Sequence, residues 1–228
     1  MSISERLIEE LDTKYAFTVP IFGGIPVPES AVVTWGIMAV LVLFSIIFVR
    51  NLKLRPKPNS LQIYLEAFIG FLNNFFTEIL GEEGKRYIPY LSTVIIYLGI
   101  SNIIGIFGIT PPTKDLNVTA GLAIMSIVLI QYAGIRAKGV KGWLKGFGQP
   151  MALITPINIM ELIIKPLSLC MRLFGNVLGA FVIMELIKFV VPAVVPAIFS
   201  LYFDFFDGFI QAYVFVFLTS LFMKEAME

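Results

Sequence analysis

Hydrophobic residues in this chain form long runs rather than the short amphipathic patterns of a soluble domain. An α-helix needs about 20 apolar residues to cross a bilayer core of about 30 Å. Five segments meet this requirement, and the expected crossings are 31–50, 88–107, 118–135, 157–191 and 197–223. The last two are longer than a perpendicular crossing needs, so we expect them to tilt or bend. The pattern predicts an all-α polytopic membrane protein whose last two helices form a long hairpin.

Segment 59–80 has a different pattern, because polar residues interrupt its apolar positions: Gln62, Glu66, Asn73, Asn74 and Glu78. It is too polar for a helix that is surrounded by lipid. We expect an amphipathic helix that lies at the membrane interface or packs on the other helices, and the sequence leaves both arrangements open.

Segment 1–30 is polar and mixed in charge, and it then becomes rich in Pro and Gly. It lacks the basic start, short apolar run and cleavage site of a secretory signal. We expect a short surface helix up to Val19, followed by a turn, with the whole segment outside the membrane. No internal repeat is present, so the chain is expected to form a single membrane domain.

Basic residues gather after the first and third expected crossings: Arg50, Lys53, Arg55 and Lys57, then Arg136, Lys138, Lys141 and Lys145. Basic loops face the cytoplasm in most membrane proteins. Two crossings separate the clusters, so both lie on one side, as this rule requires. The N-terminus is then expected outside and, after five crossings, the C-terminus in the cytoplasm.

The composition excludes several kinds of function. Only 14% of the 228 residues are charged, against about 25% in soluble domains, and the net charge of +1 gives no reason to expect a nucleic-acid partner. The chain has no histidine, the commonest general base and metal ligand. Its single cysteine, Cys170, excludes an internal disulfide and a thiolate cluster. We therefore expect no catalytic site, metal or cofactor.

Arg172 lies near the middle of the longest apolar segment. A guanidinium there costs about 3 kcal/mol on insertion scales, and it does not lose its proton. Polar residues around it are spaced by 4, 3, 4, 4 and 3 positions, which places them on one helix face: Glu161, Lys165, Ser168, Arg172, Asn176 and Gly179. This stripe is expected to face a polar surface or a watery cleft. The alternative is a hydrogen-bond network that only holds helices together.

The last segment has a matching polar face, formed by Asp204, Asp207, Gly208 and Gln211. Glu185 lies toward the same, outer end of the hairpin, and Glu161 lies toward the inner end. Acids at both ends of the hairpin, with the fixed charge of Arg172 between them, indicate two aqueous half-channels separated by an electrostatic barrier. For each carboxylate the alternative is a solvated helix end.

Three motifs carry a resemblance to a known family. The stretch PLSLCMRLFGN, from Pro166 to Asn176, resembles the arginine motif of subunit a in the membrane sector of F-type ATP synthases. The stretch QAYVFVFLT, from Gln211, resembles the last-helix motif of that family, and PPTKDLNVT, from Pro111, resembles its outer loop. The resemblance covers essentially the whole chain, including its length and the order of its crossings.

The resemblance implies a stator ion channel that lies beside a rotating ring of c subunits and contains no catalytic site of its own. Ions would pass through two offset half-channels to and from the ring carboxylates. Arg172 matches the essential arginine, and Asn176, Gln211 and Ser168 match polar residues around it. The implied partners are the c-ring, the b-subunit peripheral stalk, the other ATP synthase subunits and the lipid bilayer. The implied location is the cell membrane of a bacterium.

The chain departs from the family pattern at several positions. Many relatives carry a glutamate where this chain has Phe181, and some carry a histidine where it has Asp204. An aspartate of some relatives is replaced by Gly105, whereas Asn102 matches a polar position. Our hypothesis is that Asp204, with Glu185 or Asp207, supplies the outer titratable groups. The coupling ion, H⁺ or Na⁺, stays open.

Two other function classes would place different demands on the sequence. A secondary transporter could use Arg172 as a counter-charge for its substrate, but the repeated halves typical of such folds are not visible. An intramembrane enzyme would need a nucleophile and a base, and we find neither a Ser/Lys nor a paired-Asp arrangement.

Overall fold

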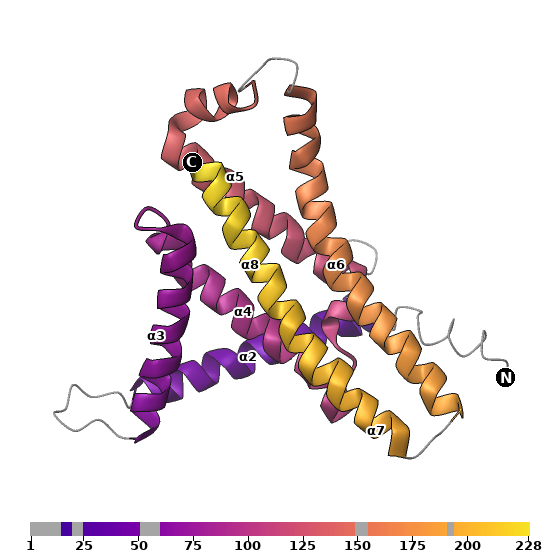
Figure 1. The fold of residues 1–228 in the computed structure, drawn as a ribbon. Helices are drawn as coiled ribbons and strands as arrows, with labels where there is room; N and C mark the ends of the chain where they lie inside the picture. The colour runs from indigo at the N-terminus through magenta and orange to yellow at the C-terminus, as the bar shows by residue number, and fades with distance from the viewer. Residues whose placement is uncertain (1–14, 20–24, 51–59, 149–154, 191–193) are drawn as a thin grey trace.

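The computed structural model describes residues 15–19, 25–50, 60–148, 155–190 and 194–228. The helices in these residues are α2 (Glu29–Arg50), α3 (Ser60–Leu80), α4 (Ile88–Ile103), α5 (Leu116–Gly146), α6 (Thr155–Val190), α7 (Val194–Ser200) and α8 (Gly208–Met227) (Figure 1). Within the described residues, five stretches are long and apolar enough to cross a membrane: 29–50, 85–107, 116–146, 155–190 and 198–227. The expected all-α polytopic architecture is confirmed.

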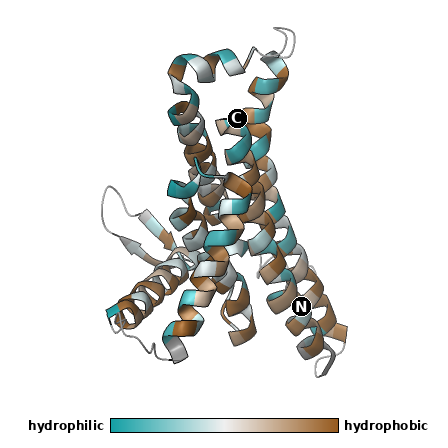
Figure 2. Ribbon diagram, turned by 60° about the vertical axis from the view of Figure 1, so that its left-hand side comes forward, coloured by the Kyte–Doolittle hydropathy of each residue, from teal (hydrophilic) through white to brown (hydrophobic). Residues whose placement is uncertain are grey.

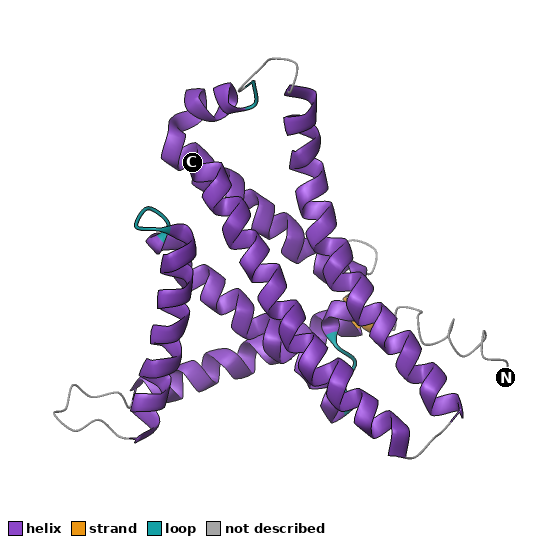
Figure 3. Ribbon diagram, in the orientation of Figure 1, coloured by secondary structure: helices purple, strands orange, loops and turns teal. Residues whose placement is uncertain are grey.

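The described part of the N-terminal segment is a β-hairpin, shown in orange in Figure 3. Strand β1 (Tyr15–Val19) pairs antiparallel with β2 (Ile25–Pro28). The surface helix expected up to Val19 is therefore wrong for residues 15–19, and the rest of that expectation, residues 1–14, lies outside the described residues. Aromatic and β-branched side chains favour a strand over a helix in β1.

Helix α3 runs crosswise to α2 in Figure 1 and packs on α4 and α8. Its inward face is formed by Leu72, Phe76 and Leu80, which are 4%, 0% and 4% exposed. Tyr64 and Phe71, in contrast, are exposed. Of the two arrangements that the sequence left open, packing on other helices therefore holds for the second half of α3.

The core of the molecule lies where α5 packs against both α6 and α8, and where α8 packs against α4. Its fully buried side chains come from all four helices: Leu91, Leu98, Ile130, Leu169, Leu173, Phe215, Val216 and Met223. Helix α6 packs mainly on α5, so the two arms of the expected hairpin meet each other only lightly. Large apolar side chains remain exposed along the outer helix faces, as a lipid environment allows. Hydrophobic residues, brown in Figure 2, run along the long helices.

Helices α4 and α8 approach each other closely at Gly208. The buried Asn102 side chain donates a hydrogen bond from Nδ2 to the carbonyl of Gly208 at 2.9 Å, and its Oδ1 accepts one from Thr113 Oγ1 at 2.8 Å. A Cβ atom at position 208 would lie 2.9 Å from the Cβ of Asn102. Only glycine fits this contact without displacing one of the two helices.

The α4–α8 contact predicts that Gly208→Ala destabilises the protein by about 1–3 kcal/mol, because the added methyl group overpacks the contact with Asn102. The matched control is Gly36→Ala, where nothing lies within 4 Å of the added Cβ and the better helix propensity of alanine is neutral or stabilising. The measurement is thermal unfolding of the assembled, detergent-purified complex. Equal midpoints for the two variants would contradict the close approach.

Candidate ion-translocation site

Arg172 lies on α6 beside the face that packs on α5. Leu169 and Leu173 on that face are 1% and 0% exposed, whereas Arg172 is only partly buried. The guanidinium makes no hydrogen bond or salt bridge with any residue that the structure describes. Ser168, one turn earlier, is on the exposed side of the helix. The positive charge is thus held in an apolar helix without a counter-charge from the described part of the chain.

An amide pair joins α6 to α8 one helical turn beyond Arg172. Asn176 Nδ2 donates to Gln211 Oε1 at 2.6 Å. Gln211 is only 3% exposed, and its buried Nε2 has no partner among the described residues. The family resemblance implied that Asn176 and Gln211 both lie around Arg172, and in the structure these two side chains bind each other. Among the described residues, Arg172 therefore stays unpaired on the same face of α6.

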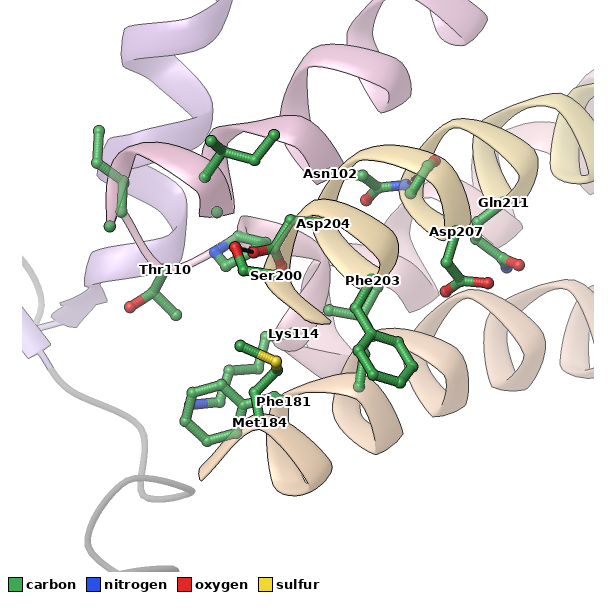
Figure 4. Close-up of a pocket in the computed structure, with 18 of the residues that line it drawn as sticks. Asn102, Thr110, Lys114, Phe181, Met184, Ser200, Phe203, Asp204, Asp207 and Gln211 are labelled. Atoms are coloured by element: carbon green, nitrogen blue, oxygen red, sulfur yellow. Dashed lines mark hydrogen bonds between the residues drawn. The ribbon is translucent and has the colours of Figure 1, made fainter. Parts of the chain in front are cut away.

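A cavity of about 370 Å³, here called the Asp204 cavity, begins at Gln211 and extends toward the end of α6 (Figure 4). It is lined by the end of α4, the loop that follows it, the second half of α6 and the start of the last helical stretch. Its polar and charged lining consists of Asn102, Thr110, Lys114, Lys188, Ser200, Asp204, Asp207 and Gln211. The cavity is therefore polar and reaches the amide pair.

Asp204 and Asp207 lie on a π-helical stretch, Leu201–Asp207, between α7 and α8. Ser200 Oγ donates a hydrogen bond to Asp204 Oδ2 at 2.7 Å. A Cβ at position 105 would lie 3.0 Å from Asp204 Oδ1, so the absence of a side chain at Gly105 makes room for this carboxylate. Both aspartates that the sequence singled out line the same cavity.

Two further positions show where the sequence expectations and the structure differ. Glu185 forms a salt bridge of 2.7 Å with Lys188 and is not among the described residues that line the Asp204 cavity. Lys114 does line it, and its Nζ lies 3.3 Å from the ring centroid of Phe181. Sequence reasoning missed Lys114, because the residue lies in a loop far along the chain from both long helices.

A second cavity of about 200 Å³, the Lys165 cavity, lies at the other end of the site, between α5, the first half of α6 and the end of α8. Lys165 Nζ is 2.9 Å from Glu225 Oε1 and 3.1 Å from Glu161 Oε2. Glu161 was expected at this end of the hairpin, whereas Glu225 was not. The sequence did contain a signal for Glu225. It follows Gln211 by 14 residues, which is close to four full helical turns and places both residues on one face of the helix.

Arg172 lies between the two cavities along α6. The Lys165 cavity includes α6 residues up to Lys165, and the Asp204 cavity includes them from Val177 onward. At a rise of about 1.5 Å per residue, Arg172 is about 10 Å from the first and about 8 Å from the second along the helix axis. Arg172 is not among the described residues that line either cavity. Two polar cavities thus approach a fixed cation from opposite ends.

Comparison with known proteins gives the family. The sequence model of the family described as ATP synthase A chain matches residues 31–224. The chain belongs to the ATP synthase subunit a family. Its role is thus that of the ion-translocating stator subunit in the membrane sector of an ATP synthase, and the secondary-transporter alternative is set aside.

Similar proteins in this family come from diverse bacteria. ATP synthase subunit a of Moorella thermoacetica is 37% identical over 202 residues, which is 88% of this chain and 91% of the relative. The sodium-ion-specific ATP synthase subunit a of Propionigenium modestum is 35% identical, over 88% of this chain and 74% of the relative. Subunit a of Legionella pneumophila strain Philadelphia 1 is 30% identical, over 92% and 89%.

The contact between Gly105 and Asp204 predicts how two substitutions combine. Gly105→Asp places a second carboxylate beside Asp204, so like-charge repulsion and crowding should slow ATP-driven ion pumping by about tenfold or more. Adding Asp204→Ala to Gly105→Asp should restore much of the rate, because one carboxylate then remains in the same part of the cavity. The measurement is the initial pumping rate in inverted vesicles with equal amounts of assembled complex. Purely additive effects of the two changes would contradict the proximity.

Proposed function

We propose that the Asp204 cavity and the Lys165 cavity belong to two offset half-channels, which carry ions to and from the carboxylates of a rotating c-ring. The observation that supports this proposal is the position of Arg172 between two polar cavities, with no counter-charge among the described residues. An ion that enters one cavity cannot continue directly to the other, because a fixed positive charge repels a passing cation. It has to leave the chain and return on the other side of the arginine.

The partner of Arg172 in this proposal is the membrane carboxylate of a c subunit. A fixed cation favours the ionised form of a nearby carboxylate, so a ring carboxylate that reaches Arg172 releases its ion. Once the ring turns further, the next polar cavity supplies an ion in exchange. The exposed side of α6, with Ser168, and the outer face of α8 are the surfaces available to the ring.

The orientation follows from the positions of the basic residues. The Lys165 cavity lies near Lys138 and the basic end of α5, so we place it on the cytoplasmic side. The Asp204 cavity, the N-terminus and the β-hairpin then lie outside, and the C-terminus lies in the cytoplasm. The location is the cell membrane of a bacterium, and the b-subunit peripheral stalk and the remaining ATP synthase subunits are the other partners.

The coupling ion of this proposal is H⁺ or Na⁺. The lining of the Asp204 cavity offers carboxylate and amide oxygens together with hydroxyl groups, which suit both ions. A relative at 35% identity is specific for sodium ions, and Na⁺ is therefore one of the two candidates. Synthesis of ATP in proteoliposomes that carry an imposed gradient of H⁺ alone or of Na⁺ alone identifies the ion.

Arg172→Ala should abolish ATP-driven ion pumping, because the barrier and the counter-charge for the ring carboxylate are both lost. The measurement is ion accumulation in inverted vesicles, alongside ATP hydrolysis by the same complexes. Arg172→Lys is the matched variant, since it keeps the charge but loses the guanidinium geometry, and it should be strongly impaired. Normal pumping by the alanine variant would refute the stator mechanism.

Asp204→Asn should slow ion transit by about tenfold or more, because the substitution removes a carboxylate from the lining of the outer cavity while keeping its shape. Asp207→Asn is expected to act in the same direction. Glu185→Gln is the control, since Glu185 is paired with Lys188 and is not one of the described lining residues. The readout is the rate of ATP synthesis as a function of external pH. A larger effect of Glu185→Gln than of Asp204→Asn would show that the wrong carboxylate was assigned.

A further inference from the structure

The last part of α5 turns away from the rest of that helix. The turn occurs at Gly139, which has φ 73° and ψ 161°, a backbone conformation that is readily accessible only to glycine. Residues 116–138 alone rise about 34 Å, close to the thickness of a bilayer core. A crossing that begins at Leu116 is therefore complete near Lys138. The segment from Val140 to Phe147 then starts at the level of the lipid headgroups and runs toward the beginning of α6 (Figure 1).

This segment, here called the interfacial segment, is held in place on one side. Trp143 Nε1 donates a hydrogen bond to Gln131 Oε1 at 2.9 Å, and its ring meets Phe147 edge-on at 4.8 Å between centroids. The carbonyl of Phe147 accepts a hydrogen bond from Asn158 Nδ2 at 2.9 Å. The interfacial segment is therefore fixed to both α5 and α6.

The other side of the interfacial segment is exposed, and it has two kinds of side chain. Val140 and Leu144 lie one helical turn apart and are 60% and 59% exposed. Lys141 and Lys145 form a parallel row beside them and are also exposed. Arg136, on the crossing just before the turn, adds a further exposed cation to this end of α5. Apolar side chains beside a row of lysines are the pattern of a helix that lies in a membrane interface.

We propose that the interfacial segment binds anionic phospholipid headgroups, with Val140 and Leu144 inserted at the acyl-chain boundary and Lys141 and Lys145 contacting the phosphates. The inference is independent of the half-channels and needs only that α5 crosses the membrane. An acidic protein surface could pair with the lysines, but it would leave two large apolar side chains unexplained. A phospholipid carries both an anionic group and an apolar chain, which accounts for both kinds of side chain on this surface. Lipid binding at this site then holds the end of α5 and the start of α6 at the membrane surface.

The test uses photo-crosslinking in the assembled ATP synthase. A benzophenone amino acid replaces Leu144, and the complex is placed in nanodiscs that contain equal parts of phosphatidylglycerol and phosphatidylcholine. Mass spectrometry of this chain then counts the adducts of each lipid. We expect phosphatidylglycerol adducts to exceed phosphatidylcholine adducts. Lys141→Gln with Lys145→Gln should reduce that ratio by up to about fivefold per lysine, and high salt should reduce it as well.

Two controls keep the result specific. A benzophenone at Val128, which is 62% exposed in the middle of α5, should capture both lipids without preference. Lys85→Gln, which changes an exposed lysine just before α4 and outside the interfacial segment, should leave the ratio at position 144 unchanged. Equal capture of the two lipids at position 144, or a preference that survives the double lysine substitution, would overturn the proposal. Adducts to another subunit in place of lipid would do the same, and would show that this surface is a protein interface.

Discussion

Arg172 carries a positive charge that no protonation change removes, on a helix that has to lie in hydrocarbon. The described residues around it are arranged so as not to neutralise it. Gln211 is paired with Asn176, and Lys165 takes up both Glu161 and Glu225. Among the described residues, Glu161 and Glu225 are paired with Lys165, and Asp204 and Asp207 line the Asp204 cavity, away from Arg172. In the proposed function, the carboxylate of a passing ring subunit supplies the counter-charge that the described residues do not provide.

The two cavities depend on how the surrounding helices are fixed. On one side, Asn102 joins α4 to α8 through the carbonyl of Gly208, and glycine at that position permits the close approach. On the other side, the ion-pair cluster around Lys165 joins the first half of α6 to the end of α8. Between these two contacts Gln211 is buried on α8, whereas the side of α6 that carries Ser168 is exposed.

The side chains around the Asp204 cavity come from different elements of the fold. The ring of Phe181 is covered by the Lys114 ammonium group. Gly105 has no side chain, and the space next to it is taken by Asp204. The negative charge thus comes from the last helical stretch rather than from α6 or α4.

The sequence by itself determined the five apolar crossings, the polar stripe around Arg172 and the family. Bilayer thickness sets the length of an apolar run, helical spacing sets the positions of a stripe, and charges within apolar runs are rare, so each of these can be read directly from the order of residues. It failed for residues 15–19, where strand propensity and pairing with β2 outweigh the polar character of the segment. Only the tertiary structure decided that Asn176 holds Gln211, that Glu225 completes the cluster at Lys165, and that Lys114 rather than Glu185 lines the Asp204 cavity. These contacts join residues 35 to about 70 positions apart in the chain, and no local pattern records which helix faces meet when the chain packs.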